Sequence, residues 1–233
     1  MADLKPRRRW TIAMIVPVLL IGVNGCGATV IYRDSFNGPA VGQPPAQPEI
    51  GTATASGDAE IAANPQDPGS SDRWLRLGRP VPTQPGGEYI GTFTETVLNT
   101  NGSVALVGFI PAASRMMMSV FFEAAPPGPP VPFLHIDLLK DGNIRVNDST
   151  VVGTYAFDTL IGFVIGFELT ASPPVANILI RGGGEDASLT VPIPANVAGF
   201  GLGRVRVFAP FEGVNAPAGA FLVNDVVATR RSN

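Results

Sequence analysis

Short apolar runs, separated by polar turns, occupy most of the chain after residue 27. Within many of these runs apolar and polar residues alternate with a period of two, as in half-buried strands. We expect strands at 28–33, 74–77, 88–98, 104–110, 116–123, 133–139, 143–146, 151–157, 161–169, 176–180, 187–193, 204–208 and 220–229. So many short strands with regular turns predict an all-β fold, an antiparallel β-sandwich.

The connections support this prediction. Lys140-Asp141-Gly142 stands between two strand-like runs, and Asp-Gly is a strong hairpin signal. Segment 39–72 is loop-rich, with two short strands expected near 49–54 and 59–62. The chain contains 27 Gly and 23 Pro, spread between the apolar runs, which opposes long helices.

The N-terminus has a different pattern. Lys5 and the arginines at 7–9 precede an apolar stretch, 11–25, which ends directly before Cys26, the one cysteine of the chain. This order resembles a bacterial lipoprotein signal, and the resemblance implies removal of residues 1–25 and lipidation of Cys26. Two alternatives stay open. In the first, Cys26 is an ordinary buried cysteine. In the second, the uncharged stretch 11–32 is an uncleaved anchor helix, because about 20 apolar residues are enough to span a bilayer.

The remaining part, 26–233, has the length of one domain. Residues 1–25 carry a net charge of +3 and the whole chain −3, so this part carries −6, with Lys140 as its one lysine. Such an acidic domain is unsuited to the phosphate backbone of nucleic acids. In lipoproteins similar to this one, an aspartate after the cysteine favours the inner membrane. Gly27 therefore indicates the outer membrane, if the host has one.

Three segments together resemble the concanavalin-A-like superfamily of lectins and glucanases. They are the turn at 34–38, the strand–Asp-Gly–strand unit at 133–146, and the closing strand at 220–229, which contains Asn224-Asp225-Val226. The resemblance implies a jelly roll in which the first and last strands pair. It also implies binding of a glycan or another envelope component, by a domain that the lipoprotein-like N-terminus would tether to the membrane.

Catalytic chemistry has little support in the sequence. Glucanases of this superfamily carry a Glu-x-Asp-x-x-Glu strand, and this spacing does not occur here. His135 is the one histidine, so neither a Ser–His–Asp triad nor a multi-histidine zinc site is available. We therefore expect no enzyme activity. A carbohydrate-active enzyme with an unfamiliar site is the least favoured hypothesis, after a structural subunit or spacer of a surface assembly.

Five side chains remain as candidates for binding. Trp74, Tyr89 and His135 offer rings to a ligand, and the alternative is that they are core or ordinary strand residues. Asp34 and Asp225 come together if the terminal strands pair, and oxygen ligands from loops suit a structural calcium ion. The alternative is that Asp34 serves a turn and Asp225 bonds to backbone. No other cofactor is expected.

Overall fold

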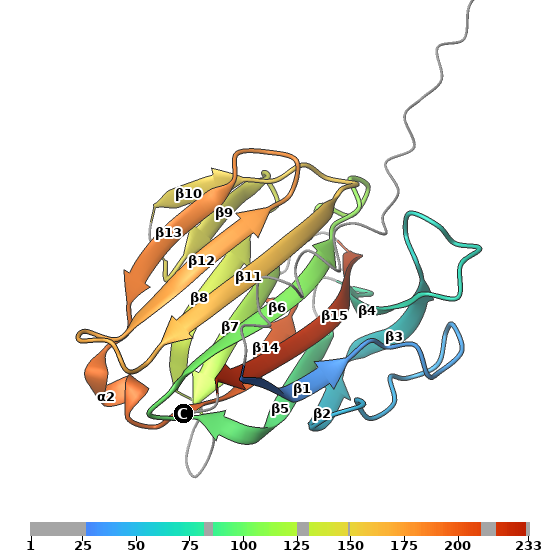
Figure 1. Cartoon of the computed structure of the whole chain (residues 1–233). Helices are drawn as coiled ribbons and strands as arrows, with labels where there is room; N and C mark the ends of the chain where they lie inside the picture. Colours follow the sequence, from blue (N-terminus) through green and yellow to red (C-terminus); the bar gives the residue numbers. More distant parts are fainter. Residues whose placement is uncertain (1–26, 82–85, 125–130, 149, 211–217, 232–233) are drawn as a thin grey trace, which may run out of the picture.

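The computed structural model describes residues 27–81, 86–124, 131–148, 150–210 and 218–231 (Figure 1). The strands are β1 Ala28–Asp34, β2 Thr52–Ser56, β3 Asp58–Ala63, β4 Arg73–Arg79, β5 Glu88–Val97, β6 Asn101–Phe109, β7 Met118–Ala124, β8 Pro132–Leu138, β9 Asn143–Val146, β10 Val151–Thr154, β11 Leu160–Glu168, β12 Val175–Arg181, β13 Ala187–Pro192, β14 Leu202–Phe208 and β15 Gly219–Arg231. One short helix, α2 Ala195–Ala198, precedes β14. In this part of the chain, no helix is long and apolar enough to cross a membrane.

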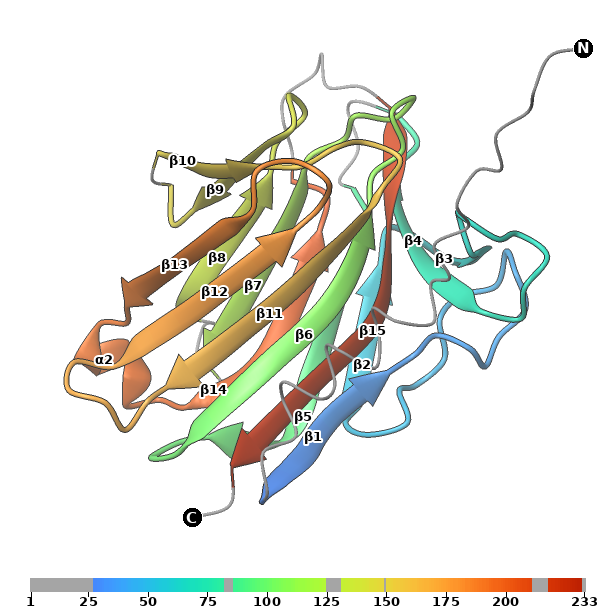
Figure 2. The same cartoon turned by 45° about the horizontal axis from the view of Figure 1, so that its top comes forward.

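The strands form two antiparallel sheets that pack face to face (Figure 2). The seven-stranded sheet has the order β10-β9-β8-β7-β14-β5-β2. The eight-stranded sheet has the order β13-β12-β11-β6-β15-β4-β3, with β1 also paired to β15. The predicted all-β antiparallel sandwich is confirmed. The predicted signal segment and Cys26 lie outside the described residues.

The core lies between the sheets because each strand turns every second side chain inward. In β11, Phe163, Ile165 and Phe167 are at most 1% exposed, while the residues between them are partly exposed. Across the sandwich, Val205 and Val207 of β14 are fully buried. Burial of each such side chain stabilises the fold by roughly 1.5–3 kcal/mol.

The two ends of the chain meet at one sheet, as the sequence resemblance implies. Strand β1 pairs antiparallel with β15, and Asp34 lies opposite Val226. The predicted hairpin also forms: β8 pairs with β9, and Gly142 between them has a φ of +88°. That left-handed backbone conformation favours glycine.

The loop-rich segment 39–72 contains two strands that belong to different sheets. Strand β2 pairs with β5 in the seven-stranded sheet, and β3 pairs with β4 in the eight-stranded sheet. Gly57 connects them with a φ of +68°, and a Cβ there would lie 2.8 Å from the carbonyl oxygen of Gly86. The segment therefore crosses from one sheet to the other at a point where only glycine fits.

Candidate functional site

The outer face of the seven-stranded sheet carries a continuous polar and aromatic surface, which we call the belt. Alternation along the strands places these side chains outward, because their neighbours in sequence, such as Val120 and Val205, fill the core. Strand β14 lies between β7 and β5 and brings their outward residues together. The belt consists of Glu88, Ser119, Phe121, Glu123, His135, Asp137, Arg145, Arg204, Arg206 and Phe208.

Aromatic rings form the centre of the belt. Phe121 stacks on His135 with ring centroids 4.8 Å apart and an interplanar angle of 33°. Phe208 meets Phe121 edge to face at 5.1 Å. The Arg206 guanidinium lies 4.4 Å from the centroid of the Phe208 ring, a cation–π distance. All four side chains are partly exposed, so a ligand can reach them.

Asp137 organises the polar half of the belt. Its carboxylate, 3% exposed, accepts hydrogen bonds from Ser119 Oγ at 2.5 Å, His135 Nε2 at 3.0 Å and Arg145 Nη2 at 2.9 Å. Burial by itself would raise the pKa of Asp137, but these three donors outweigh burial and lower it. The hydrogen bond to Asp137 raises the pKa of His135, so this pair favours a carboxylate and an imidazolium.

Two further carboxylates in the belt are held by arginine. Glu123, whose side chain is 2% exposed, accepts from Arg204 Nε at 2.6 Å and lies 3.8 Å from Arg206 Nη1. Arg206 Nε also donates to Glu88 Oε1 at 2.5 Å. Arg206 is therefore fixed from two sides by carboxylates and from a third by the Phe208 ring.

A depression of about 850 Å³ begins at this end of the belt. Glu88, Arg206 and Phe208 of the belt line it, together with Pro80 and Pro210, which follow β4 and β14. Its volume falls within the range of small-molecule sites, roughly 300–1,000 Å³. An exposed ring beside fixed donors and acceptors is the usual composition of a site for a polar ligand with an apolar face.

The belt carboxylates differ in their partners from the pair that glycoside hydrolysis uses. That reaction uses a carboxylic acid with a raised pKa beside a second carboxylate. Within the described belt, Asp137, Glu123 and Glu88 each bond to an arginine, and the pKa of Asp137 is lowered. Arginine contacts thus engage all three of these belt carboxylates.

One trio within reach of the belt has donor atoms close enough for a metal ion. The ligand atoms of His135, Asp137 and Asp148 all lie within 4.8 Å of one another. Arg145 Nη2, however, lies 2.9 Å from Asp137 and 3.9 Å from Asp148. The arginine already provides the positive charge that these carboxylates need, and we assign no metal to them.

The sequence-predicted rings divide into two groups. His135 lies in the belt, with 16% of its side chain exposed. Trp74 and Tyr89 are 3% and 0% exposed, which agrees with the alternative that they are core residues, although Tyr89 also lines a hollow beside β2. The Trp74 indole donates to Asp72 Oδ2 at 3.0 Å, and the Tyr89 hydroxyl donates to Asp34. Internal hydrogen-bond partners thus let both polar rings be buried.

The calcium site at Asp34 and Asp225 stays a prediction, and the structure shows how each of the two carboxylates is held. Both oxygens of Asp34 are used internally: one accepts from the Phe36 backbone N–H at 2.9 Å and the other from the Tyr89 hydroxyl. Burial raises the pKa of Asp34 to about 6, and burial with the nearby Asp72 raises that of Asp225. Among the described residues, neither aspartate belongs to a group of three acidic or histidine ligands at metal-binding distances.

Sequence reasoning missed most of the belt. A signal was nevertheless present, in Phe121-Phe122-Glu123 of β7 and the alternating Arg204, Arg206 and Phe208 of β14. Charges at every second position of an otherwise apolar strand indicate an outward face. Which strands lie beside β14 depends on the sheet order, which the sequence alone does not provide.

Comparison with known proteins agrees with this architecture. No protein-family model and no curated protein matches the sequence. Among solved structures, an endo-1,3-β-glucanase from Streptomyces sioyaensis has a TM-score of 0.55 and 12% identity, covering 90% of this chain and 99% of the other. Lectin I from Ulex europaeus has 0.54 and 12%, covering 88% and 97%. This chain has their jelly-roll fold.

A third structure shows that the fold also occurs within larger proteins. A sialidase from Trypanosoma rangeli matches with a TM-score of 0.56 and 14% identity, over 91% of this chain and 32% of the sialidase. At these identities the likeness establishes the fold and leaves the activity open.

Proposed function

We propose that this protein is a carbohydrate-binding protein of the bacterial cell envelope and that the belt is its binding face. The observation that carries the proposal is the belt's centre: partly exposed Phe121 and Phe208 beside a fixed Arg206. A sugar has an apolar C–H face that packs on aromatic rings and hydroxyls that bond to charged groups, so it suits this surface. The fold shared with lectins is a further, associational support.

A glycan array probed with the full chain in detergent tests this proposal. We expect retention of at least one glycan class, and a loss of about tenfold in affinity for Phe208→Ala, since an aromatic contact contributes on the order of 1.5 kcal/mol. Phe200→Ala is the matched control, because Phe200 is 59% exposed and lies outside the belt. Absence of any bound glycan, or equal loss in both variants, would overturn the proposal.

We also propose that the domain is non-catalytic. Its support is the pairing of each buried belt carboxylate, Asp137 and Glu123, with an arginine. Incubation with β-1,3-glucan and with sialyllactose should release neither reducing ends nor sialic acid. Release that rises with protein concentration, and that heat inactivation removes, would contradict this part of the proposal.

The third part of the proposal is anchoring through a lipid on Cys26, in the outer membrane where the host has one. The support is the order of charges and apolar residues at the N-terminus. Two lipid groups anchor a protein stably, whereas one chain binds only marginally. Intact mass should show a lipidated chain that begins at Cys26, and Cys26→Ser should abolish lipidation. An unlipidated full-length chain would show an uncleaved anchor instead, and an unlipidated shortened chain would show plain secretion.

A further inference from the structure

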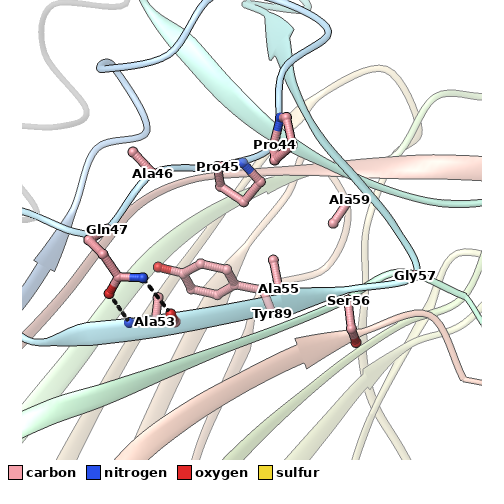
Figure 3. Close-up of a pocket in the computed structure, with 10 residues that line it drawn as sticks. All are labelled: Pro44, Pro45, Ala46, Gln47, Ala53, Ala55, Ser56, Gly57, Ala59 and Tyr89. Carbon is pink, nitrogen blue, oxygen red and sulfur yellow. Dashed lines mark hydrogen bonds between the residues drawn. The ribbon is translucent and has the colours of Figure 1, made fainter.

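Strand β2 is an edge strand of the seven-stranded sheet. Along its outer side, the backbone groups of Ala53 have hydrogen-bond partners, and those of Ala55 have none among the described residues. Strand β2 pairs on one side with β5. On its other side, the Gln47 amide bonds to both backbone groups of Ala53: Nε2 donates to the carbonyl at 2.9 Å, and Oε1 accepts from the N–H at 3.1 Å (Figure 3). Gln47 thus makes the two bonds that a neighbouring strand would make.

The Gln47 contact reveals the orientation of the next residues. In an antiparallel pair, every second residue directs both backbone groups away from its partner. Ala53 directs its groups away from β5, and therefore Ala55, two residues later in the same strand, does so too. Among the described residues, no backbone bond reaches Ala55 from this outer side. Ala55 is also exposed.

A hollow of about 300 Å³ lies against this open edge. Pro44 and Pro45 line it across from Ala55, and Ala59 and Gly57 lie beyond the end of β2 (Figure 3). Proline has no N–H, so neither proline can donate to the Ala55 carbonyl as Gln47 does to that of Ala53. At about 30 Å³ per molecule, the hollow has room for roughly ten waters, which is enough for a small side chain and its backbone.

We propose that this hollow binds an extended segment of a partner protein, which adds to β2 through Ala55. One residue of the segment accepts from the Ala55 N–H and donates to its carbonyl, as in other cases of strand addition. The side chain of that same residue lies on the face shared by Ala55 and Tyr89, and a small apolar group there fits between Pro45 and Ala59. Ser56 and Gly57 line both this hollow and the depression beside the belt, but no belt residue lines the hollow, and it adds protein binding to the proposed glycan binding.

The shape of the edge favours a flexible segment over a second copy of the chain. Gln47 covers Ala53, and β2 ends at Ser56 before the turn at Gly57. One residue of the edge is therefore available. Pairing between two β2 strands would need several such residues and would bring the prolines of the two copies together. A single extended peptide needs one pair of bonds and a narrow opening.

Peptide selection on the full chain in detergent tests the proposal. A random heptapeptide library displayed on phage is panned against wild type, with Ala55→Pro as the counter-selection. Ala55→Pro removes only the outward N–H, and proline is tolerated at such positions in edge strands. Ala55→Ser is the matched control, since it keeps the N–H and nearly the same volume.

We expect enriched peptides whose synthetic copies bind wild type and Ala55→Ser equally and bind Ala55→Pro at least tenfold more weakly. N-methylation of the peptide should abolish binding at the one position whose N–H donates to the Ala55 carbonyl and leave binding unchanged at the other positions. This second measurement does not depend on the folding of any variant. Glycan binding should be the same in all three proteins, so the failure of either proposal is distinguishable from the failure of the other.

Other outcomes would overturn the inference. No enrichment over the counter-selection, or uniform tolerance of N-methylation, would show that no strand is added at Ala55. Concentration-dependent self-association that Ala55→Pro removes would identify a second copy as the occupant. Binding that emerges only after removal of residues 1–25 would show that the chain's own N-terminus occupies the hollow.

Discussion

Two buried carboxylates in this protein, Asp137 and Asp34, have pKa values that are shifted in opposite directions relative to an ordinary aspartate. In the belt, Asp137 is surrounded by Ser119, His135 and Arg145, and its pKa is lowered. Near the paired chain ends, Asp34 has a tyrosine hydroxyl and one backbone N–H as partners, and its pKa is raised to about 6. Asp137 therefore stays ionised at neutral pH, whereas Asp34 takes up a proton as the pH falls through about 6.

The difference follows from what each cluster does. A surface that binds a polar ligand needs charges held in fixed positions, and arginine provides them next to the carboxylates. The Asp34 cluster instead joins two structural elements: Asp34 lies on β1, and Tyr89 lies on β5 of the opposite sheet, where it also bonds to Tyr32. Burial raises the pKa of both tyrosines, which stay protonated and act as neutral hydrogen-bonding groups.

The largest expected effect is from Asp137→Asn, which removes the charge that three donors share. We expect a loss of about 3 kcal/mol in unfolding free energy at pH 7, because a buried ion pair broken on one side leaves its partner uncompensated. Asp148→Asn is the control: that side chain is 78% exposed and lies 3.9 Å from the same arginine, and we expect less than about 0.5 kcal/mol. Urea denaturation measures both, and equal losses would contradict the comparison.

A smaller effect of the opposite kind is expected at Asp34. Because its folded pKa is about 6 against an ordinary value of 3.8, its contribution to stability is complete below pH 3.8 and is lost as the pH rises through about 6. From pH 4 to pH 7 this loss amounts to about 2 kcal/mol. Asp34→Asn, which carries no titrating proton, should remove that part of the pH dependence. Urea denaturation at pH 4 and pH 7 measures this. If the difference in unfolding free energy between the two pH values is the same in Asp34→Asn as in wild type, the titrating group is another residue.

The sequence was sufficient for the elements and for their sandwich arrangement. Period-two alternation predicted the strands, as in β11, and the Asp-Gly turn predicted the hairpin of β8 and β9. These signals are local, since each depends on residues within one or two strands. The pairing of β1 with β15 came from the family resemblance, and the structure confirms it.

The candidate site was largely beyond sequence reasoning, for two physical reasons. The belt combines β5, β7, β8, β9 and β14, whose order in the sheet is set by contacts distant in sequence. The second reason is the burial of polar rings. Trp74 and Tyr89 are buried because Asp72 accepts a hydrogen bond from the Trp74 indole and Asp34 accepts one from the Tyr89 hydroxyl. The sequence shows a tryptophan and a tyrosine and does not show which carboxylates they bond to.

The smallest expected effect is from Tyr89→Phe, and it tests the Asp34 cluster most directly. Loss of the hydroxyl leaves one oxygen of a buried carboxyl without its donor, which costs about 1 kcal/mol. The Tyr89 hydrogen bond lowers the pKa of Asp34, so the variant should raise that pKa further and move the loss of stability to higher pH. Tyr32→Phe is the matched control, because its hydroxyl bonds to Tyr89 and not to Asp34. If both variants shift the pH dependence equally, the two tyrosines and Asp34 titrate as one unit, and the contrast with the arginine-bound Asp137 then belongs to the whole cluster.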